Sequence, residues 1–231
     1  MLNWAARYFP IVRVLKQHLS KVDSILEIGS GSVGIGKFYP SAFVGCDLGF
    51  AFKPRPPMLP VLASATQLPF SKSSFDAVIA SDVLEHIPPD RRMSAIRETL
   101  RVTRKLAIFG FPSGPGAFDW DCKLAKAYDC RKLERPVWLG EHLRYGFPDD
   151  RLFEDLKQEW SVTSFGNENQ RFHDWVMRKE MHRSWDYGFR VLLAIAPRIM
   201  EHVLARADRE PFYRRIVLVR PVRQSPDPSR G

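Results

Sequence analysis

The stretch Ser24-Ile25-Leu26-Glu27-Ile28-Gly29-Ser30-Gly31-Ser32-Val33-Gly34 decides the fold of this chain. It begins as an apolar run suited to a buried parallel strand, reaches a carboxylate at Glu27, and ends in a glycine-rich turn. The glycines at positions 29, 31 and 34 have the G-x-G-x-x-G spacing, which lets backbone approach a nucleotide closely at a strand-to-helix turn. The stretch therefore predicts a nucleotide-binding βαβ unit.

Glu27 narrows the choice of nucleotide. A dinucleotide would place its pyrophosphate over the turn, where a nearby carboxylate would repel it. S-adenosylmethionine carries a positive ammonium and a positive sulfonium, which a carboxylate attracts. We therefore expect S-adenosylmethionine at this turn, with Glu27 toward its ammonium.

Two other interpretations apply to the same loop. Residues 31–37 also fit G-x-x-x-x-G-K, the phosphate loop of nucleotide triphosphatases, but Phe38 stands where that loop needs a hydroxyl for magnesium. A structural glycine turn without any ligand is the alternative if the stretch is taken alone.

The next apolar run, residues 42–47, predicts a second buried strand that ends in Asp47. This aspartate follows the glycine turn by about twenty residues, where a carboxylate can accept both ribose hydroxyls of a nucleotide. An aspartate that only caps a loop is the alternative. Further strands are expected at residues 60–63, 74–80, 105–111, 161–165 and 212–220.

Five motifs occur in order between residues 24 and 112: L-E-I-G-x-G, V-G-x-D, A-x-x-L-P-F, S-F-D-x-V and L-E-H-I-P. In this order and spacing the chain resembles class I S-adenosylmethionine-dependent methyltransferases, and most closely those that act on small molecules, lipids and sugars. The resemblance implies an α/β, Rossmann-like fold. Its sheet would have seven mostly parallel strands, an antiparallel seventh strand and helices on both faces.

The same resemblance implies the cofactor contacts. Gly29 and Gly31 would approach the methionine end, Asp47 would hold the ribose, and Ser81 would contact the methionine portion from the end of the fourth strand. The full set comprises Glu27, Gly29, Ser30, Gly31, Asp47, Leu48, Ser64, Ala65, Thr66 and Ser81. Ser64 departs from the family, which often has an aspartate there, so the adenine contact would rest on a hydroxyl and on backbone of Ala65 and Thr66.

Methyl transfer from a sulfonium is an in-line displacement, so the protein mainly aligns the acceptor and excludes water. A base is needed only when the acceptor is a poor nucleophile such as a hydroxyl. His86, just past the fourth strand, is the first candidate base, with a structural role in the turn before Pro88 as the alternative. His142 is the second candidate, because Glu141 beside it could orient the ring and raise its basicity.

Composition adds weaker expectations. The chain has 231 residues, a formal net charge of +9, three cysteines and six histidines. The charge fits either an anionic partner or a solvated basic face. Three cysteines without a C-x-x-C pair indicate a reducing, cytoplasmic compartment, and the histidines show no ligand spacing, so no metal is expected.

The expected organisation is a single domain over residues 1–222. Residues 1–20 predict an amphipathic helix that caps the domain, with a transit peptide as the alternative. Residues 112–149 form an insert that serves as a substrate wall or lid, and residues 168–206 form a helical segment between the last two strands. Residues 223–231 are a Pro/Ser/Arg-rich tail expected to be disordered. The apolar run at residues 191–196 is too short to span a bilayer, so it either packs on the sheet or lies against an anionic membrane surface.

The leading function is methylation of an oxygen, or less favourably a nitrogen, on a small molecule, lipid or saccharide. RNA is an alternative acceptor because of the basic charge, although Ser81-Asp82-Val83-Leu84 stands where amino-group methylation of bases often uses N-P-P-[FYW]. A non-catalytic protein that binds S-adenosylmethionine is a second alternative. Glu27 and the lack of room for a second domain disfavour a dehydrogenase. The oligomeric state does not follow from the sequence.

Overall fold

The computed structural model describes residues 1–21 and 23–222, and the expected disordered tail at 223–231 lies outside the described residues. Seven strands form one sheet in the order β3-β2-β1-β4-β5-β7-β6. Their bounds are β1 (Ile25–Ile28), β2 (Phe43–Asp47), β3 (Met58–Leu62), β4 (Phe75–Ser81), β5 (Thr103–Pro112), β6 (Trp160–Asn169) and β7 (Phe212–Pro221).

The sheet confirms the expected Rossmann-like topology. The first five strands pair in parallel, whereas β7 runs antiparallel to both of its neighbours, β5 and β6. The register places Ile28 of β1 beside Cys46 of β2 and Ala80 of β4. The carboxyl ends of these three strands therefore meet at one edge of the sheet, which is where open α/β sheets bind ligands.

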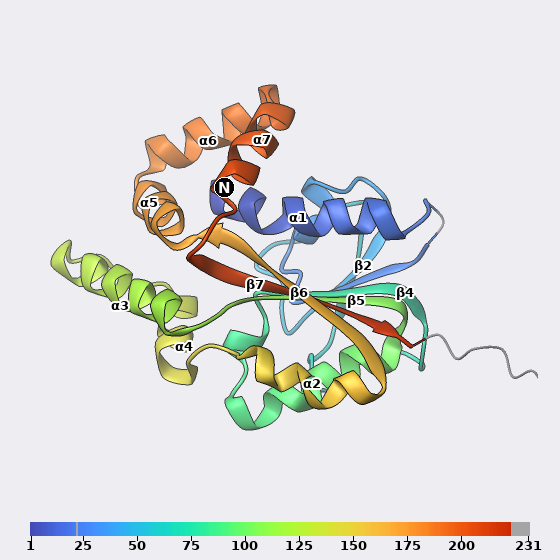
Figure 1. The fold of residues 1–231 in the computed structure, drawn as a ribbon. Helices are drawn as coiled ribbons and strands as arrows, with labels where there is room; N and C mark the ends of the chain where they lie inside the picture. The colour runs from blue at the N-terminus through green and yellow to red at the C-terminus, as the bar shows by residue number, and fades with distance from the viewer. Residues whose placement is uncertain (22, 223–231) are drawn as a thin grey trace, which may run out of the picture.

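Helices cover both faces of the sheet (Figure 1). Figure 1 places α1 and α5–α7 on one side and α2 on the other. The helices are α1 (Leu2–His18), α2 (Pro89–Val102), α3 (Pro115–Cys130), α4 (Val137–Tyr145), α5 (Gln170–Glu180), α6 (Arg183–Ile195) and α7 (Pro197–Ala207). Four short 3₁₀ helices complete the list: η1 (Gly34–Lys37), η2 (Leu84–His86), η3 (Asp150–Phe153) and η4 (Asp155–Gln158).

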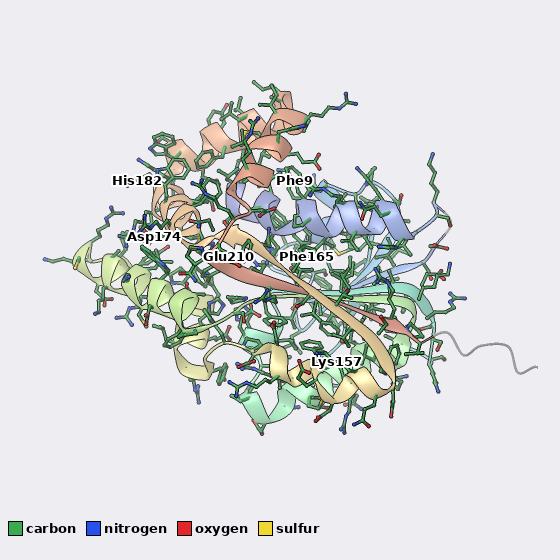
Figure 2. The ribbon with its side chains drawn as sticks, in the orientation of Figure 1. Phe9, Lys157, Phe165, Asp174, His182 and Glu210 are labelled. Atoms are coloured by element: carbon green, nitrogen blue, oxygen red, sulfur yellow. The ribbon has the colours of Figure 1, made fainter. Side chains whose placement is uncertain are left out.

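The alternation of side chains along β4 and β5 builds a core on each face. Val78 and Phe109 pack with Ile96 of α2 in one apolar cluster. Their neighbours Ile79 and Ile108 belong to the opposite cluster, which includes the buried stripe of α1. Side chains crowd both faces in Figure 2, where Phe9 of α1 and Lys157 of η4 lie on opposite sides of the sheet. Strands buried on both faces explain the unbroken apolar runs in the sequence.

Several elements differ from the sequence expectation in length or type. The helix that a βαβ unit would have after the glycine turn is only the single 3₁₀ turn η1, and the segment before β6 contains the two 3₁₀ turns η3 and η4. Asp149 caps η3, because its carboxylate accepts a hydrogen bond from the backbone N–H of Arg151 at 2.9 Å. Strand β6 extends to Asn169, four residues beyond the expected end.

The insert and the helical segment have defined places in the chain. The insert contains α3 and α4, which pack on each other through an apolar cluster with Leu124 and Leu139 at its centre. The helical segment consists of α5, α6 and α7, between β6 and β7. Among residues 1–21 and 23–222, no helix combines the length and apolarity that a bilayer crossing requires.

Candidate active site

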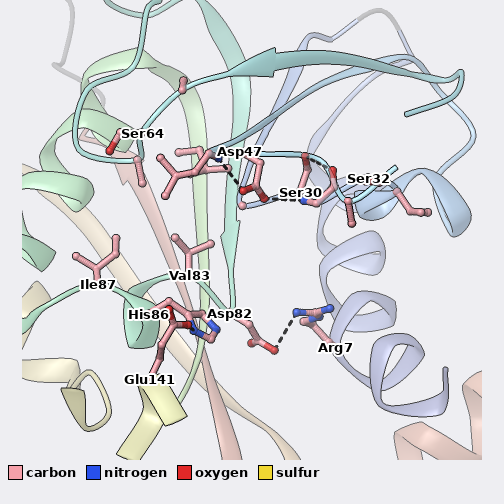
Figure 3. Close-up of a pocket in the computed structure, with 18 of the residues that line it drawn as sticks. Arg7, Ser30, Ser32, Asp47, Ser64, Asp82, Val83, His86, Ile87 and Glu141 are labelled. Carbon is pink, nitrogen blue, oxygen red and sulfur yellow. Dashed lines mark hydrogen bonds and ion pairs between the residues drawn. The ribbon is translucent and has the colours of Figure 1, made fainter. Parts of the chain in front are cut away.

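A cavity of about 910 Å³ opens at the carboxyl ends of β1, β2 and β4. The glycine turn after β1, the end of β2 and the loop after β3 form one part of its wall. The loop after β4, helix α1 and one residue of α4 form the other part. In Figure 3, Asp47, Ser30 and Ser64 lie along one side of this cavity, and Asp82, His86 and Glu141 lie along the other.

The glycine turn has a backbone that other residues adopt poorly. Gly29 and Gly31 have φ values of +68° and +54°, in the left-handed region that favours glycine. A Cβ at position 29 would collide with the side chain of Val83, whereas a Cβ at position 31 would meet open space. The turn thus exposes bare backbone beside the cavity, which suits a ligand that must approach closely.

Eight of the ten predicted cofactor residues line the cavity: Gly29, Ser30, Gly31, Asp47, Leu48, Ser64, Ala65 and Thr66. Asp47 is fixed from two sides, because its carboxylate accepts hydrogen bonds from the N–H of Gly31 at 2.8 Å and of Leu48 at 2.7 Å. The carboxylate retains lone pairs that can accept ribose hydroxyls. Ser64 and Thr66, in the loop after β3, hold each other through their hydroxyls at 2.9 Å and shape the same side of the cavity.

Glu27 and Ser81 differ from the prediction, because neither lines the cavity. Glu27 is buried behind the glycine turn, where it accepts hydrogen bonds from the Tyr8 hydroxyl at 2.5 Å and the Ile35 N–H at 2.7 Å. It therefore fixes the turn to α1 and η1 instead of facing a ligand ammonium. Ser81 is the last residue of β4 and pairs with Gly110 of β5. Its side chain is buried, and its hydroxyl lies beside Gly110 and does not face the cavity.

Three charged residues without a predicted role support the cavity wall. Asp82 follows Ser81 and has a φ of +52°. Its carboxylate accepts a hydrogen bond from Arg7 at 3.0 Å and two from the buried Arg214, at 2.9 Å and 3.0 Å. Burial would raise the pKa of Asp82, but Arg214 and Arg7 outweigh it and lower that pKa. Arg214 also binds Glu168 at 2.9 Å. The sequence did contain a signal for Asp82, because an acidic residue directly after a buried strand often lies in a binding site. No sequence signal pointed to Arg7 or Arg214.

His86 lies on the acceptor side of the cavity and is paired with Glu141. Its Nδ1 is 2.7 Å from Glu141 Oε2, and both side chains line the cavity. The buried Arg92 ties these two segments together, since it donates to carbonyls of Leu84 in η2 and of residues 145 and 146 at the end of α4. Helix α4 of the insert thereby contributes to the wall of the cavity.

The structure corrects the predicted partner of His142. Its Nδ1 lies 2.6 Å from Asp121 Oδ2, and Glu141 instead pairs with His86. Successive side chains on helix α4 point in different directions, so Glu141 does not reach the ring of His142 and cannot orient it. His142 is buried and does not line the cavity, yet its ring centroid is 4.9 Å from that of His86. The two predicted bases are therefore neighbours.

Comparison with known proteins agrees with this geometry. The methyltransferase domain family matches residues 26–111, which run from β1 through β5 and include the glycine turn, Asp47 and His86. Residues 26–111 therefore form a methyltransferase domain. No curated protein sequence matches the chain.

Solved structures share the fold of this methyltransferase at low sequence identity. An S-adenosylmethionine-dependent methyltransferase from Thermotoga maritima is 15% identical, with a TM-score of 0.55 and 96% of this chain and 92% of that chain covered. Magnesium protoporphyrin IX methyltransferase from Synechocystis, with bound S-adenosylhomocysteine, is 13% identical, with a TM-score of 0.51 and coverage of 95% and 84%.

The cavity fits S-adenosylmethionine, the cofactor expected for a methyltransferase domain with this fold. The open backbone at Gly31 and the carboxylate of Asp47 suit the nucleoside side. Arg7 of α1 lies on the opposite wall next to Asp82. When bound, the cofactor supplies an electrophilic methyl group on a sulfonium, and the residues of this chain orient it and exclude water.

Glu27 of the methyltransferase gives a prediction for stability. Burial raises its pKa to about 7, against the opposing hydrogen bonds from Tyr8 and Ile35. Between pH 4.5 and 7 the native state then binds more protons than the unfolded state, so its stability falls as pH rises. Over this range the ionisation of Glu27 lowers the free energy of unfolding by about 3 kcal/mol in total, since a difference of one pKa unit corresponds to about 1.4 kcal/mol. We expect Glu27→Gln to remove that decline.

Urea unfolding of both proteins at several pH values between 4.5 and 8 checks this expectation. The variant should gain stability relative to the wild type as pH rises, because the amide carries no proton that the native state must lose. A difference between the two proteins that stays constant over this range would contradict the assigned titration.

Proposed function

We propose that the protein transfers the methyl group of S-adenosylmethionine to an oxygen of a small-molecule, lipid or saccharide acceptor. The observation that carries the proposal is the His86–Glu141 pair on the cavity wall, opposite the residues assigned to the nucleoside. The sulfonium needs no activation, but an acceptor hydroxyl must lose its proton. A histidine on this wall suits that task.

The environment of His86 supports its use as a proton acceptor. Burial and the neighbouring His142 lower its pKa, while Glu141 opposes them. A lowered pKa keeps the imidazole neutral at pH 7, so that one nitrogen can accept a proton. In the proposed step the acceptor oxygen bonds to the methyl carbon as the carbon–sulfur bond breaks. The sulfur keeps the electron pair as a thioether, and the hydroxyl proton passes to His86.

Methyl transfer from radiolabelled S-adenosylmethionine to panels of hydroxylated small molecules, glycans and lipids tests the proposal. We expect label in one of these classes and a strong loss with His86→Gln, which keeps the size of the side chain but not its basicity. Label found only in RNA, with a steep loss of binding at high salt, would favour RNA as the acceptor. Cofactor binding without transfer to any class would favour the non-catalytic binding protein.

The surface of α6 and α7 supports the lipid class of acceptor. Ile195 and Ile199 are 73% and 66% exposed, and the exposed Arg198 lies between them. Apolar side chains with arginines between them suit the interface of an anionic membrane. On the same helix α6, Arg190 reaches the cavity. We propose that this face contacts an anionic membrane surface from the cytoplasm. The three free cysteines support that placement.

Sedimentation with lipid vesicles checks this membrane contact. We expect binding to vesicles that contain phosphatidylserine and less to vesicles of phosphatidylcholine alone. Ile195→Asp with Ile199→Asp should weaken binding at least about tenfold, because the variant must bring two charges to an apolar boundary. Val137→Asp, which changes another exposed apolar residue on α4, is the matched control. Equal effects of the two variants would argue against a specific face.

A further inference from the structure

Glu85, His86 and His142 form a cluster that the spacing of histidines in the sequence did not predict. The fold brings residues 56 positions apart to the same place, so that one ligand atom from each side chain lies within 4.8 Å of the other two. We propose that these three side chains bind a divalent transition-metal ion at the acceptor side of the cavity. Two imidazoles and one carboxylate are a donor set that such ions take, with coordination positions left for other ligands.

Each imidazole of the cluster has a carboxylate behind it. Nδ1 of His86 lies 2.7 Å from Glu141, and Nδ1 of His142 lies 2.6 Å from Asp121. A histidine that binds a metal through one ring nitrogen typically donates the other N–H to a carboxylate, which fixes the tautomer and orients the ring. Here both rings are held in that way, which leaves both Nε2 atoms for an ion.

The atoms that would face the ion have no other task. Three buried atoms of the cluster have no hydrogen-bond partner among the described residues: both carboxylate oxygens of Glu85 and Nε2 of His142. Unpartnered buried polar atoms cost free energy and are rare in folded proteins. Nε2 of His142 lies 4.0 Å from Oε1 of Glu85. Two ligand atoms at about 2.1 Å from one ion lie about 3.4 Å apart in a tetrahedral site, so a small approach of these two side chains lets one ion bind both.

Charge and access also favour a cation here. The cluster and its supports contain three carboxylates, those of Glu85, Asp121 and Glu141. Two nearby arginines, Arg7 and Arg214, are already paired with Asp82. Arg92, which lies close to Glu85, donates its N–H groups to backbone carbonyls of η2 and α4. Glu85 and His142 are buried, but His86 is partly exposed and lines the cavity, so an ion can enter there and meet an acceptor.

The role of the ion rests on the proposed function. A metal ion at this place binds the acceptor oxygen and lowers the pKa of the hydroxyl. The hydroxyl proton then leaves to water at the cavity mouth, and the oxygen attacks the methyl carbon as the carbon–sulfur bond breaks. His86 acts in this case as a ligand, and no longer as the proton acceptor.

Metal titration of the full chain tests the site directly. The protein is stripped with a chelator and titrated with Co²⁺, whose visible absorption reports bound imidazole, and then with Zn²⁺ and Mn²⁺ by calorimetry. We expect one ion per chain, and at least a hundredfold weaker binding in Glu85→Gln and in His142→Gln. Glu141→Gln and Asp121→Asn should weaken binding about tenfold to a hundredfold, because they remove only the support of a ligand. His202→Gln, on the exposed surface of α7, is the control for adventitious binding by histidine.

The outcomes separate this proposal from the proposed function. One ion per chain that depends on Glu85 and His142 but not on His202 supports the site, whatever the protein transfers. No ion, or binding that neither Glu85→Gln nor Glu141→Gln weakens, would overturn it and leave Glu85 as a neutral buried acid. If the stripped protein transfers methyl groups at the full rate, the ion has no catalytic role and His86 is the base. Failure to bind S-adenosylmethionine would overturn the proposed function alone.

Discussion

Asp47→Ala is expected to weaken binding of S-adenosylmethionine by at least about a hundredfold. The Asp47 carboxylate lies at the end of β2 on the cavity wall, where the N–H groups of Gly31 and Leu48 hold it in place. Two hydrogen bonds from ribose hydroxyls to a charged acceptor contribute about 1.5–3 kcal/mol each. Their loss corresponds to a factor of a hundred or more, since about 1.4 kcal/mol is tenfold. Calorimetric titration with S-adenosylmethionine and S-adenosylhomocysteine measures it.

The control for Asp47→Ala is Asp119→Ala, which removes an exposed aspartate of α3 outside the cavity wall. We expect this control to bind the cofactor as the wild type does. Thermal unfolding without ligand establishes that both variants are folded. Unchanged cofactor affinity in folded Asp47→Ala would mean that the ribose lies elsewhere in the cavity, and would reverse the assignment of its two sides.

Arg214→Met is expected to destabilise the protein by about 3–5 kcal/mol, the cost of leaving buried charges without their partner. Arg214 is 2% exposed and pairs with Asp82 on the cavity wall and with Glu168, which is 1% exposed. Arg7 would still contact Asp82, but the carboxylate of Glu168 would keep only the hydrogen bond with His173 at 3.1 Å. Urea unfolding at pH 7 gives the change in the free energy of unfolding.

Two further variants decide whether burial causes this effect. Arg151→Met removes an arginine of an exposed ion pair with Asp149, and we expect a change below about 1 kcal/mol. Adding Glu168→Gln to Arg214→Met should recover part of the lost stability, because it removes one unpaired charge. Equal losses in Arg214→Met and Arg151→Met, or no recovery in the double variant, would show that Glu168 is not the group left unpaired.

The parts of the fold and site that the sequence predicts are those with a local signal. The glycine turn, the acid at the end of β2 and the buried runs of β1, β4 and β5 are each legible within about ten residues. The cofactor contacts expected of them use backbone or a side chain at the end of a strand, so their positions follow from the topology of the sheet. These residues account for the nucleoside side of the cavity.

The acceptor side depends on contacts between distant segments. Glu141 precedes His142 in the chain, but the helical geometry of α4 sends it to His86, 55 residues away, and gives His142 to Asp121. Arg7 and Arg214 reach Asp82 from elements outside the five motifs. Glu27 and Ser81 show the reverse case, since a motif places the residue correctly but does not tell which side its side chain faces. The local pattern alone cannot supply these pairings.

The place of β7 in the sheet has a consequence for synthesis of the chain. Strand β7 follows β6 in sequence but lies between β5 and β6, and it pairs with both. During translation the edge of β5 therefore stays unpaired until β7 leaves the ribosome, and β6 has no place in the sheet before then. An apolar strand edge that waits for its partner is prone to pair with other chains. Chaperone demand and yield at high expression should thus depend on how fast the segment from β6 to β7 is made.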